Sequence, residues 1–263
     1  MATDAEANCP VSPESDGRGT TMMIDSGLPT GLFTDVLESH GSLFDIVKFG
    51  WGTALVTKDI KRKIDICREH GVGAMCGGTL FERYVWCGRF DDYRRLMADL
   101  GVTHVEVSNG TIPLDSRTKA RYVTAMATDY PVLAEVGFKD PTLSATLTPA
   151  DWIDAVRRDL AAGATFVVTE TRESGKSGIA NPDGTIRSDV LRALLNAVDP
   201  TRLLFEAPTK DLQTELIRRV GPAVNVGNIA WTDLVGLETL RLGLRSDTLL
   251  DIEPATAPAL AAA

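Results

Sequence analysis

The chain has 263 residues, of which 36 are Asp or Glu and 27 are Lys or Arg, so its formal net charge is −9 and its isoelectric point is near 4.9. An acidic chain of this kind is not built to bind nucleic acid or an anionic membrane, and we expect neither as a partner. Hydrophobic residues make up 44% and charged residues 24%, and the mean hydropathy is zero, which is typical of a soluble globular protein and excludes the disordered, fibrous and membrane-spanning classes.

The predicted elements lie between two polar or Ala-rich ends. Residues 1–20 lack apolar periodicity and are expected to form a disordered N-terminal tail, and residues 251–263 a flexible C-terminal tail. Within residues 21–250, eight short apolar runs predict strands: Thr21–Ile24, Ile46–Phe49, Val72–Met75, His104–Val107, Val132–Val136, Phe166–Val168, Leu203–Phe205 and Val224–Val226.

Helical patterns separate these strands. Apolar residues at helical spacing precede Gly71, Gly101 and Gly163, and a predicted strand follows each glycine. Strand starts lie about thirty residues apart, which is the size of a βα unit and requires parallel strands with crossover helices. Eight such units predict a single-domain (β/α)8 TIM barrel. An open doubly wound sheet is the alternative, but no Gly-x-Gly-x-x-Gly follows any strand.

The cysteine spacing and the N-terminal residues indicate the cellular compartment. The acidic N-terminal residues are in the wrong order and of the wrong charge for a secretory signal, and the cysteines form no Cys-x-x-Cys pair. We therefore expect a cytoplasmic protein without a disulfide framework. Cys76 ends the third strand but has no histidine near it in sequence, so we expect it to serve packing.

Residues that close the strands are the candidates for function, because a barrel builds its active site at the C-terminal ends of its strands. Acids close five of the eight: Asp25, Glu106, Glu135, Glu170 and Glu206. The other ends carry Lys48, Gly77 with Gly78, and Asn228, and Ser108 with Asn109 follows Glu106. Converging carboxylates repel one another unless cations offset their charge.

An oxygen-rich site of this kind, without histidine, suits Mg²⁺ better than Zn²⁺. We expect a subset of the five acids to hold Mg²⁺, with Lys48, Lys139 and Arg172 offsetting part of the remaining charge.

Residues 170–178 are typical of an anion-binding loop. Arg172 offers a bidentate fork, and the glycines expose backbone N–H groups. Glycine and asparagine beside the last strand occupy the place where many barrels hold a phosphate. The candidate substrate-binding residues are therefore Lys48, Ser108, Asn109, Arg172, Ser174, Gly175, Gly227 and Asn228.

At these motifs the sequence resembles the phosphosulfolactate synthases. The resemblance runs from Met22 to about Asp247. It includes Ile-Asp-Ser-Gly-Leu-Pro (24–29), Val-Lys-Phe-Gly-Trp-Gly-Thr (47–53), Gly-Gly-Thr-Leu-Phe-Glu (77–82), Val-Glu-Val-Ser-Asn-Gly (105–110), Glu-Val-Gly-Phe-Lys (135–139), Glu-Thr-Arg-Glu-Ser-Gly (170–175), Phe-Glu-Ala-Pro (205–208) and a closing helix over 237–245.

The resemblance implies a (β/α)8 barrel and a carbon–sulfur lyase. Such an enzyme uses Mg²⁺ to add sulfite to C3 of phosphoenolpyruvate, giving (2R)-phospho-3-sulfolactate on the route to coenzyme M and other sulfonates. Lys139 matches the family lysine thought to protonate C2, while Lys48 and Arg172 would hold anionic groups, with Lys48 as the rival proton donor. We expect desolvation to bring the pKa of Lys139 toward the working pH, and we expect a homo-oligomer.

Two positions depart from the family pattern. Ser26 stands where the family usually has Lys, and Phe138 where a second Lys often precedes the proton donor. Fewer cations would weaken the binding of doubly charged sulfite, so the first alternative is the same chemistry with another nucleophile or another three-carbon enol acid. The second alternative is a non-catalytic protein like the plant heat-stress-associated proteins, which the family also resembles.

Overall fold

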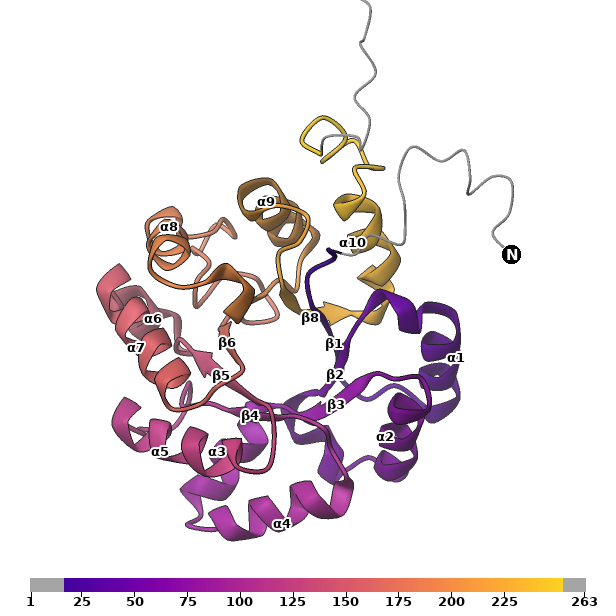
Figure 1. Ribbon diagram of the computed structural model, residues 1–263, viewed down its shortest axis with the longest axis vertical. Helices are drawn as coiled ribbons and strands as arrows, with labels where there is room; N and C mark the ends of the chain where they lie inside the picture. The colour runs from indigo at the N-terminus through magenta and orange to yellow at the C-terminus, as the bar shows by residue number, and fades with distance from the viewer. Residues whose placement is uncertain (1–16, 253–263) are drawn as a thin grey trace, which may run out of the picture.

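Eight parallel strands form a ring in the computed structural model, which describes residues 17–252 (Figure 1). The strands are β1 (Thr21–Asp25), β2 (Ile46–Phe49), β3 (Gly73–Cys76), β4 (Val105–Val107), β5 (Val132–Val136), β6 (Phe166–Thr169), β7 (Leu203–Glu206) and β8 (Val226–Ala230). Their order is β3-β2-β1-β8-β7-β6-β5-β4. Backbone hydrogen bonds from Thr103 and His104 to the Ala74 carbonyl join the β3 and β4 ends of this order. The predicted single-domain (β/α)8 TIM barrel is confirmed.

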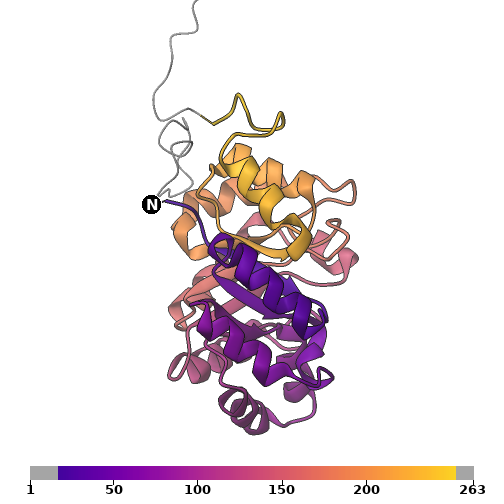
Figure 2. The same ribbon diagram turned by 90° about the vertical axis from the view of Figure 1, so that its right-hand side faces the viewer.

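Helices follow the strands and surround the ring (Figures 1 and 2). They are α1 (Thr30–His40), α2 (Ile60–Glu69), α3 (Gly78–Trp86), α4 (Phe90–Leu100), α5 (Ser116–Ala127), α6 (Pro141–Thr146), α7 (Pro149–Ala161), α8 (Ser188–Ala197), α9 (Lys210–Val220) and α10 (Leu234–Arg241). Several begin at side-chain caps: Asp115 caps α5, and Thr148 with Asp151 forms a capping box on α7. Gly101 ends α4 with φ +72°, as the helix-to-glycine pattern predicts.

Two apolar layers hold the barrel together. The larger layer lies between the strands and the helices and contains Phe33, Tyr93, Trp152 and Phe205, all buried. The smaller layer fills the barrel interior with one side chain from each of six strands: Met22, Ile46, Met75, Leu133, Val168 and Leu204. Cys76 is buried within the larger layer, and burial raises its pKa to about 12, in agreement with a packing role.

A charged layer follows the inner apolar layer because strand side chains alternate in direction. Two residues beyond Ile46, Leu133, Val168 and Leu204, the same strands place charged side chains inside the ring: Lys48, Glu135, Glu170 and Glu206. All of these groups are buried. The fold thus carries several charges into the interior at the C-terminal ends of the strands.

The last strand lies later in the chain than the apolar pattern predicts. We expected Val224–Val226, but β8 spans Val226–Ala230 and includes a glycine and an asparagine. The pattern fails here because Gly227 is required by packing: a Cβ on it would meet Leu204 and Met22 within 3 Å. Because β8 extends to Ala230, Asn228 lies within the strand, where its φ is +54°.

The described ends of the chain contact the barrel. Within the predicted N-terminal tail, Arg18 forms an ion pair with Asp45 at 2.9 Å, and at the other end Asp251 pairs with Arg218 at 2.7 Å. The rest of both predicted tails, residues 1–16 and 253–263, lies outside the described residues. No helix in residues 17–252 is long and apolar enough to cross a membrane.

Candidate active site

Lys48 lies among three buried carboxylates at the C-terminal end of the barrel. Its Nζ is 3.0 Å from Glu106 Oε1, 3.0 Å from Glu206 Oε1 and 3.9 Å from Glu135 Oε2. Burial alone would lower the pKa of Lys48, but the three carboxylates outweigh burial and raise it. Lys48 therefore stays an ammonium ion at neutral pH.

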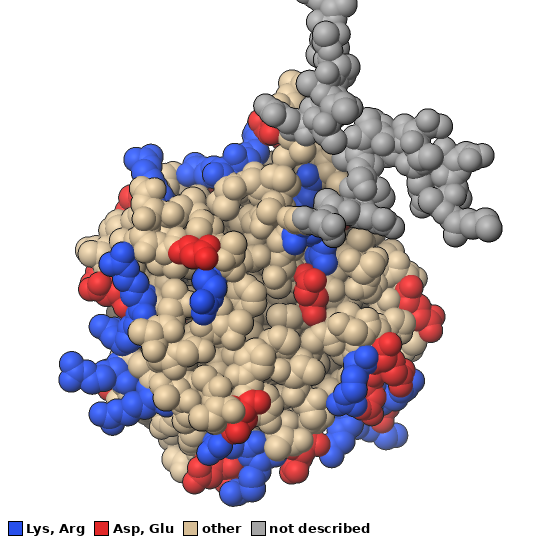
Figure 3. Space-filling model, viewed as in Figure 1, with Lys and Arg blue, Asp and Glu red and all other residues tan. Residues whose placement is uncertain are grey.

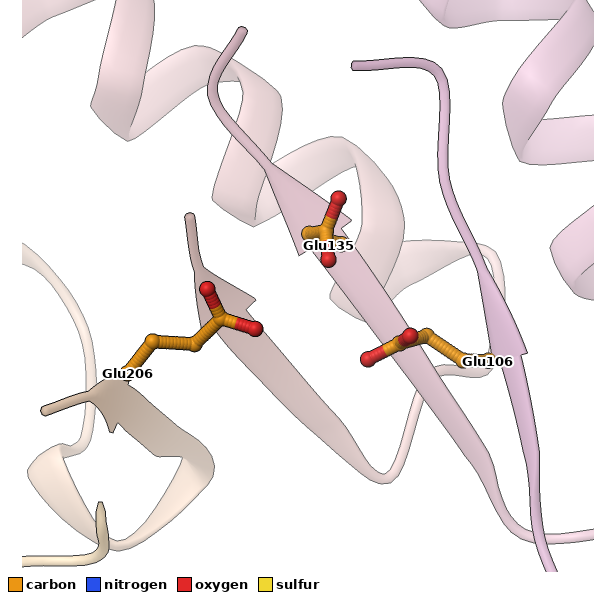
Figure 4. Close-up of side chains that lie close together, drawn as sticks. All are labelled: Glu106, Glu135 and Glu206. Atoms are coloured by element: carbon orange, nitrogen blue, oxygen red, sulfur yellow. The ribbon is translucent and has the colours of Figure 1, made fainter. Parts of the chain in front are cut away.

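Glu106, Glu135 and Glu206 point toward one another from β4, β5 and β7 (Figure 4). One oxygen of each lies within 4.8 Å of the others, and all three side chains are buried. Backbone amides hold the remaining oxygens of two of them: Gly78 N–H donates to Glu106 Oε2 at 2.5 Å, and Thr171 N–H donates to Glu206 Oε2 at 2.8 Å. This buried acidic triad could bind a metal ion.

Lys139 forms the second cationic centre of the site. Its Nζ donates to Glu135 Oε1 at 3.0 Å and to Glu170 Oε2 at 2.5 Å. Burial lowers the pKa of Lys139, but the carboxylates of Glu135, Glu170 and Glu206 more than compensate and raise it above its ordinary value. The expectation that desolvation would bring this pKa down is wrong, because attraction to the neighbouring carboxylates outweighs the effect of burial.

The carboxylates divide into one that stays ionised and three that resist ionisation. Burial works against ionisation of Glu135, but Lys139 and Lys48 lower its pKa to about 2. Burial raises the pKa of Glu106 to about 7, and burial with neighbouring like charges raises those of Glu170 and Glu206. Two lysines are too few to keep all four carboxylates ionised, so the cluster favours protons or a further cation.

A cavity of about 420 Å³ opens onto this cluster. Its charged lining comprises Lys48, Glu106, Glu135, Lys139, Glu170, Arg172, Glu173 and Glu206, and its other lining includes Ser26, Trp51, Thr111, Thr171 and Asn228. Arg172 is half exposed, with its Nε 3.7 Å from Glu173 Oε2. Figure 3, which shows one face of the molecule along the view of Figure 1, places most charged side chains toward the outline, in keeping with burial of the cluster.

Asp25 does not join the other four acids. Lys63 of α2 donates to Asp25 Oδ2 at 2.6 Å, and the N–H groups of Gly27 and Leu28 donate to its other oxygen at 2.7 Å each. Its oxygens thus serve a buried ion pair and the turn after β1. The structure brings Glu106, Glu135, Glu170 and Glu206 together and leaves Asp25 apart.

Several predicted substrate-binding residues also lie outside the cavity lining. Ser108 Oγ donates to Glu82 at 2.6 Å, and Asn109 Nδ2 donates to the Leu114 carbonyl at 2.8 Å. Three others that do not line the cavity are Ser174, Gly175 and Gly227. Asn228 does line it, and its Oδ1 is buried without a hydrogen-bond partner among the described residues.

Comparison with known proteins gives a consistent family. A family model described as (2R)-phospho-3-sulfolactate synthase matches residues 11–247. The chain is 42% identical over 231 residues to the phosphosulfolactate synthase of Bacillus subtilis, covering 88% of this chain and 92% of that protein. It is 40% identical over 245 residues to the phosphosulfolactate synthase of Methanothermobacter thermautotrophicus, covering 91% and 95%.

The chain belongs to the (2R)-phospho-3-sulfolactate synthase family. Family membership confirms the resemblance stated from the motifs, and with it the enzyme class, a lyase. A plant relative, the protein HEAT-STRESS-ASSOCIATED 32 of Arabidopsis thaliana, is more distant, at 25% identity over 241 residues and 82% of each chain. Among solved structures, 3-hexulose-6-phosphate synthase from Salmonella typhimurium matches with a TM-score of 0.55 at 14% identity, covering 86% of this chain and 100% of that chain, which supports the fold.

Sequence reasoning missed two buried charges beside this phosphosulfolactate synthase-family site. Lys63 lies on the apolar face of α2 with Ile60 and Ile64. A lysine on an apolar helix face indicates a buried acidic partner. Glu82, in the Gly-Gly-Thr-Leu-Phe-Glu block, is buried and accepts hydrogen bonds from the segment after β4. No spacing rule connects a helix glutamate to that segment.

Proposed function

We propose that this chain is a Mg²⁺-dependent phosphosulfolactate synthase that adds sulfite to C3 of phosphoenolpyruvate. The observation that carries the proposal is the set of four buried glutamates with Lys48 and the partly buried Lys139 at the mouth of a barrel whose sequence belongs to this family. The cavity of about 420 Å³ is large enough for a three-carbon phosphorylated acid.

The charge balance of the site supports a divalent cation. Four carboxylates face two ammonium groups, and burial together with neighbouring like charges raises the pKa values of Glu106, Glu170 and Glu206. A divalent cation would supply the positive charge that these carboxylates need in order to ionise together. The oxygens of Glu106, Glu135 and Glu206 are the candidates to hold the ion, and hard oxygen ligands favour Mg²⁺. When bound, such an ion would act as a Lewis acid that stabilises negative charge on the substrate carboxylate.

Removal of divalent metal is expected to abolish turnover. A phosphorylated carboxylate entering the cavity brings several negative charges next to four carboxylates that only two lysines face, so we expect binding and reaction both to require a further cation. The measurement is activity after exhaustive dialysis against a chelator, followed by titration with Mg²⁺. Restored activity is expected, whereas full activity in protein shown to be metal-free would contradict the metal requirement.

The side chains of the site fit the two steps of the addition. Sulfite donates its sulfur lone pair to C3, the C2–C3 π electrons move to C2 and the carboxylate, and a proton is then added at C2 while the phosphate ester stays in place. Lys139 keeps its proton at neutral pH because its pKa is raised, and it faces the cavity, so we assign it as the C2 proton donor. Neutralisation of Glu135 and Glu170 in the substrate complex would lower the pKa of Lys139 and release that proton.

Arg172 is proposed to bind the phosphate or sulfonate group at the cavity mouth. Arg172→Lys keeps the charge but loses the planar fork, so we expect the Michaelis constant to rise by about tenfold, the loss of roughly one charge-assisted hydrogen bond. Steady-state kinetics with each substrate varied in turn would measure the effect. An unchanged Michaelis constant and unchanged turnover would remove Arg172 from substrate binding.

Of the two positions that depart from the family pattern, only Ser26 lines the main cavity. Phe138 does not line the main cavity; it lines a second one of about 240 Å³ together with Val136, Leu147 and Ala155. Its replacement of a lysine therefore removes no charge from the lining described here. Ser26 does line the main cavity, so a different nucleophile or enol acid remains the alternative that this one position supports.

Direct assay tests the proposed activity. The protein is incubated with phosphoenolpyruvate, sulfite and Mg²⁺, and phosphorus NMR follows the ester signal, with one arm lacking sulfite and one lacking protein. Sulfite-dependent replacement of the enol phosphate signal by an alkyl phosphate signal is expected. No change with sulfite, or conversion without it, would contradict the proposal. We further propose that the enzyme works in the cytoplasm as a homo-oligomer.

A further inference from the structure

Glu82 is a buried acid that holds a segment of the chain rather than a cation. It lies in α3 with 2% of its surface exposed, and within residues 17–252 no Lys or Arg forms an ion pair with it. Its Oε1 accepts from Ser108 Oγ at 2.6 Å and Gly110 N–H at 3.1 Å, and its Oε2 accepts from Thr111 N–H at 2.9 Å and Ile112 N–H at 3.0 Å. Successive N–H groups that converge in this way form an anion-binding hollow, here filled by the side chain of the protein itself.

The segment that Glu82 holds, residues 108–112, lies directly against the proposed proton donor. The Lys139 backbone N–H donates to the Gly110 carbonyl at 3.0 Å. A Cβ placed on Gly110 would lie 3.3 Å from Lys139 Cγ and 3.5 Å from Glu135 Oε1, so the glycine backbone packs against this ion pair. Displacement of the segment would therefore displace the Lys139 side chain.

We propose that Glu82 is a positioning residue that fixes Lys139 against Glu135 and Glu170 through the 108–112 segment. The segment connects the two residues. It donates hydrogen bonds to Glu82, and its Gly110 accepts a backbone hydrogen bond from Lys139 and packs against the Lys139 side chain. This inference rests on the proposed function only in the role given to Lys139, since the path itself is a matter of structure.

Two variants perturb the path from opposite ends. In Glu82→Gln, an amide N–H₂ replaces one of the two acceptor oxygens and faces N–H donors. The 108–112 segment therefore loses some of the hydrogen bonds that hold it. Gly110→Ala pushes a methyl group against Lys139 and leaves Glu82 unchanged. We expect both to lower turnover by about 10²-fold, the usual effect of misplacing a reacting group by roughly 1 Å. The phosphoenolpyruvate dissociation constant, from calorimetry, should change less than about threefold, because Lys48 and Arg172, the residues proposed to hold the anionic groups, are not part of the 108–112 contact.

A chemical readout separates positioning from a general loss of structure. Lysines are acetylated with limiting acetic anhydride, and peptide mass spectrometry gives the labelled fraction of Lys139 relative to Lys48. In both variants we expect labelling of Lys139 to rise by about tenfold relative to Lys48, as expected when about one charge-assisted hydrogen bond holding the ammonium is lost. Glu215→Gln is the matched control, because it removes a helix glutamate that accepts the Ile186 N–H at 3.0 Å, and it should leave the ratio unchanged.

The labelling experiment distinguishes a positioning role of Glu82 from a general loss of structure. An unchanged labelling ratio in the folded variants, or a parallel rise at Lys48 and Lys139, would overturn the positioning role. If Glu82→Gln does not fold, Gly110→Ala provides the same comparison. The labelling result does not depend on turnover, so a failure of the sulfite reaction would contradict the proposed function without affecting this test.

Discussion

Lys139→Ala is expected to lower turnover by about 10²–10⁴, the usual loss when a general acid is removed. Lys139 faces the cavity between Glu135 and Glu170, and its raised pKa keeps it protonated until the substrate complex forms. Stopped-flow or steady-state measurement of the sulfite reaction gives the rate, and calorimetry gives the affinity for phosphoenolpyruvate.

Lys139→Arg is the matched control for charge. Arginine still offsets Glu135 and Glu170 but does not release a proton near neutral pH, so we expect the fold to be kept and turnover to stay low. Activity near that of the wild type in either variant would transfer the proton donor role to Lys48, the other lysine that lines the cavity.

Lys48→Met is expected to lower the free energy of unfolding by about 3–5 kcal/mol, because it leaves buried carboxylates without their cation. Glu106 and Glu206 each lie 3.0 Å from the lost ammonium group. The deficit should be smaller at pH 6 than at pH 8. Burial already raises the pKa of Glu106 to about 7, and loss of Lys48 raises it further, so protonation at pH 6 removes the uncompensated charge.

Urea denaturation at the two pH values measures this deficit. Lys61→Met is the matched control, since Lys61 is exposed on α2, and its effect should lie within about 0.5 kcal/mol of zero. A Lys48→Met deficit as small as that of the control, or one that does not depend on pH, would contradict the view that Lys48 compensates the buried acids.

The sequence predicted most of the barrel because local pattern determines it. Short apolar runs recur eight times, helical stripes that end in a glycine precede three of them, and the acids at strand ends mark the mouth. The boundary of β8 was missed because Gly227, which leaves no room for a side chain beside Met22 and Leu204, and the polar Asn228 interrupt the apolar pattern. Period-two alternation also accounts for Glu135, Glu170 and Glu206, each two residues beyond an inner apolar side chain.

Local sequence pattern does not predict which charged residues pair across the barrel. Asp25 closes a strand like the other acids, yet it pairs with Lys63, which lies 38 positions later in the chain. The pKa of Lys139 was predicted in the wrong direction because Glu135, four positions away, and Glu170, 31 positions away, both lie against its ammonium group and raise it. Distances between such groups depend on the closure of the ring, which residue spacing alone does not specify.

Carbon NMR of a reaction run in D₂O tests the central claim most directly. The substrate is phosphoenolpyruvate labelled with ¹³C at C2 and C3, with sulfite and Mg²⁺ present. The account predicts that C3 changes from a vinyl carbon to a methylene bonded to sulfur, and that C2 becomes a deuterium-bearing carbon that still holds its phosphate. Labelled phosphoenolpyruvate that stays unchanged, or that yields pyruvate and free phosphate instead, would contradict it.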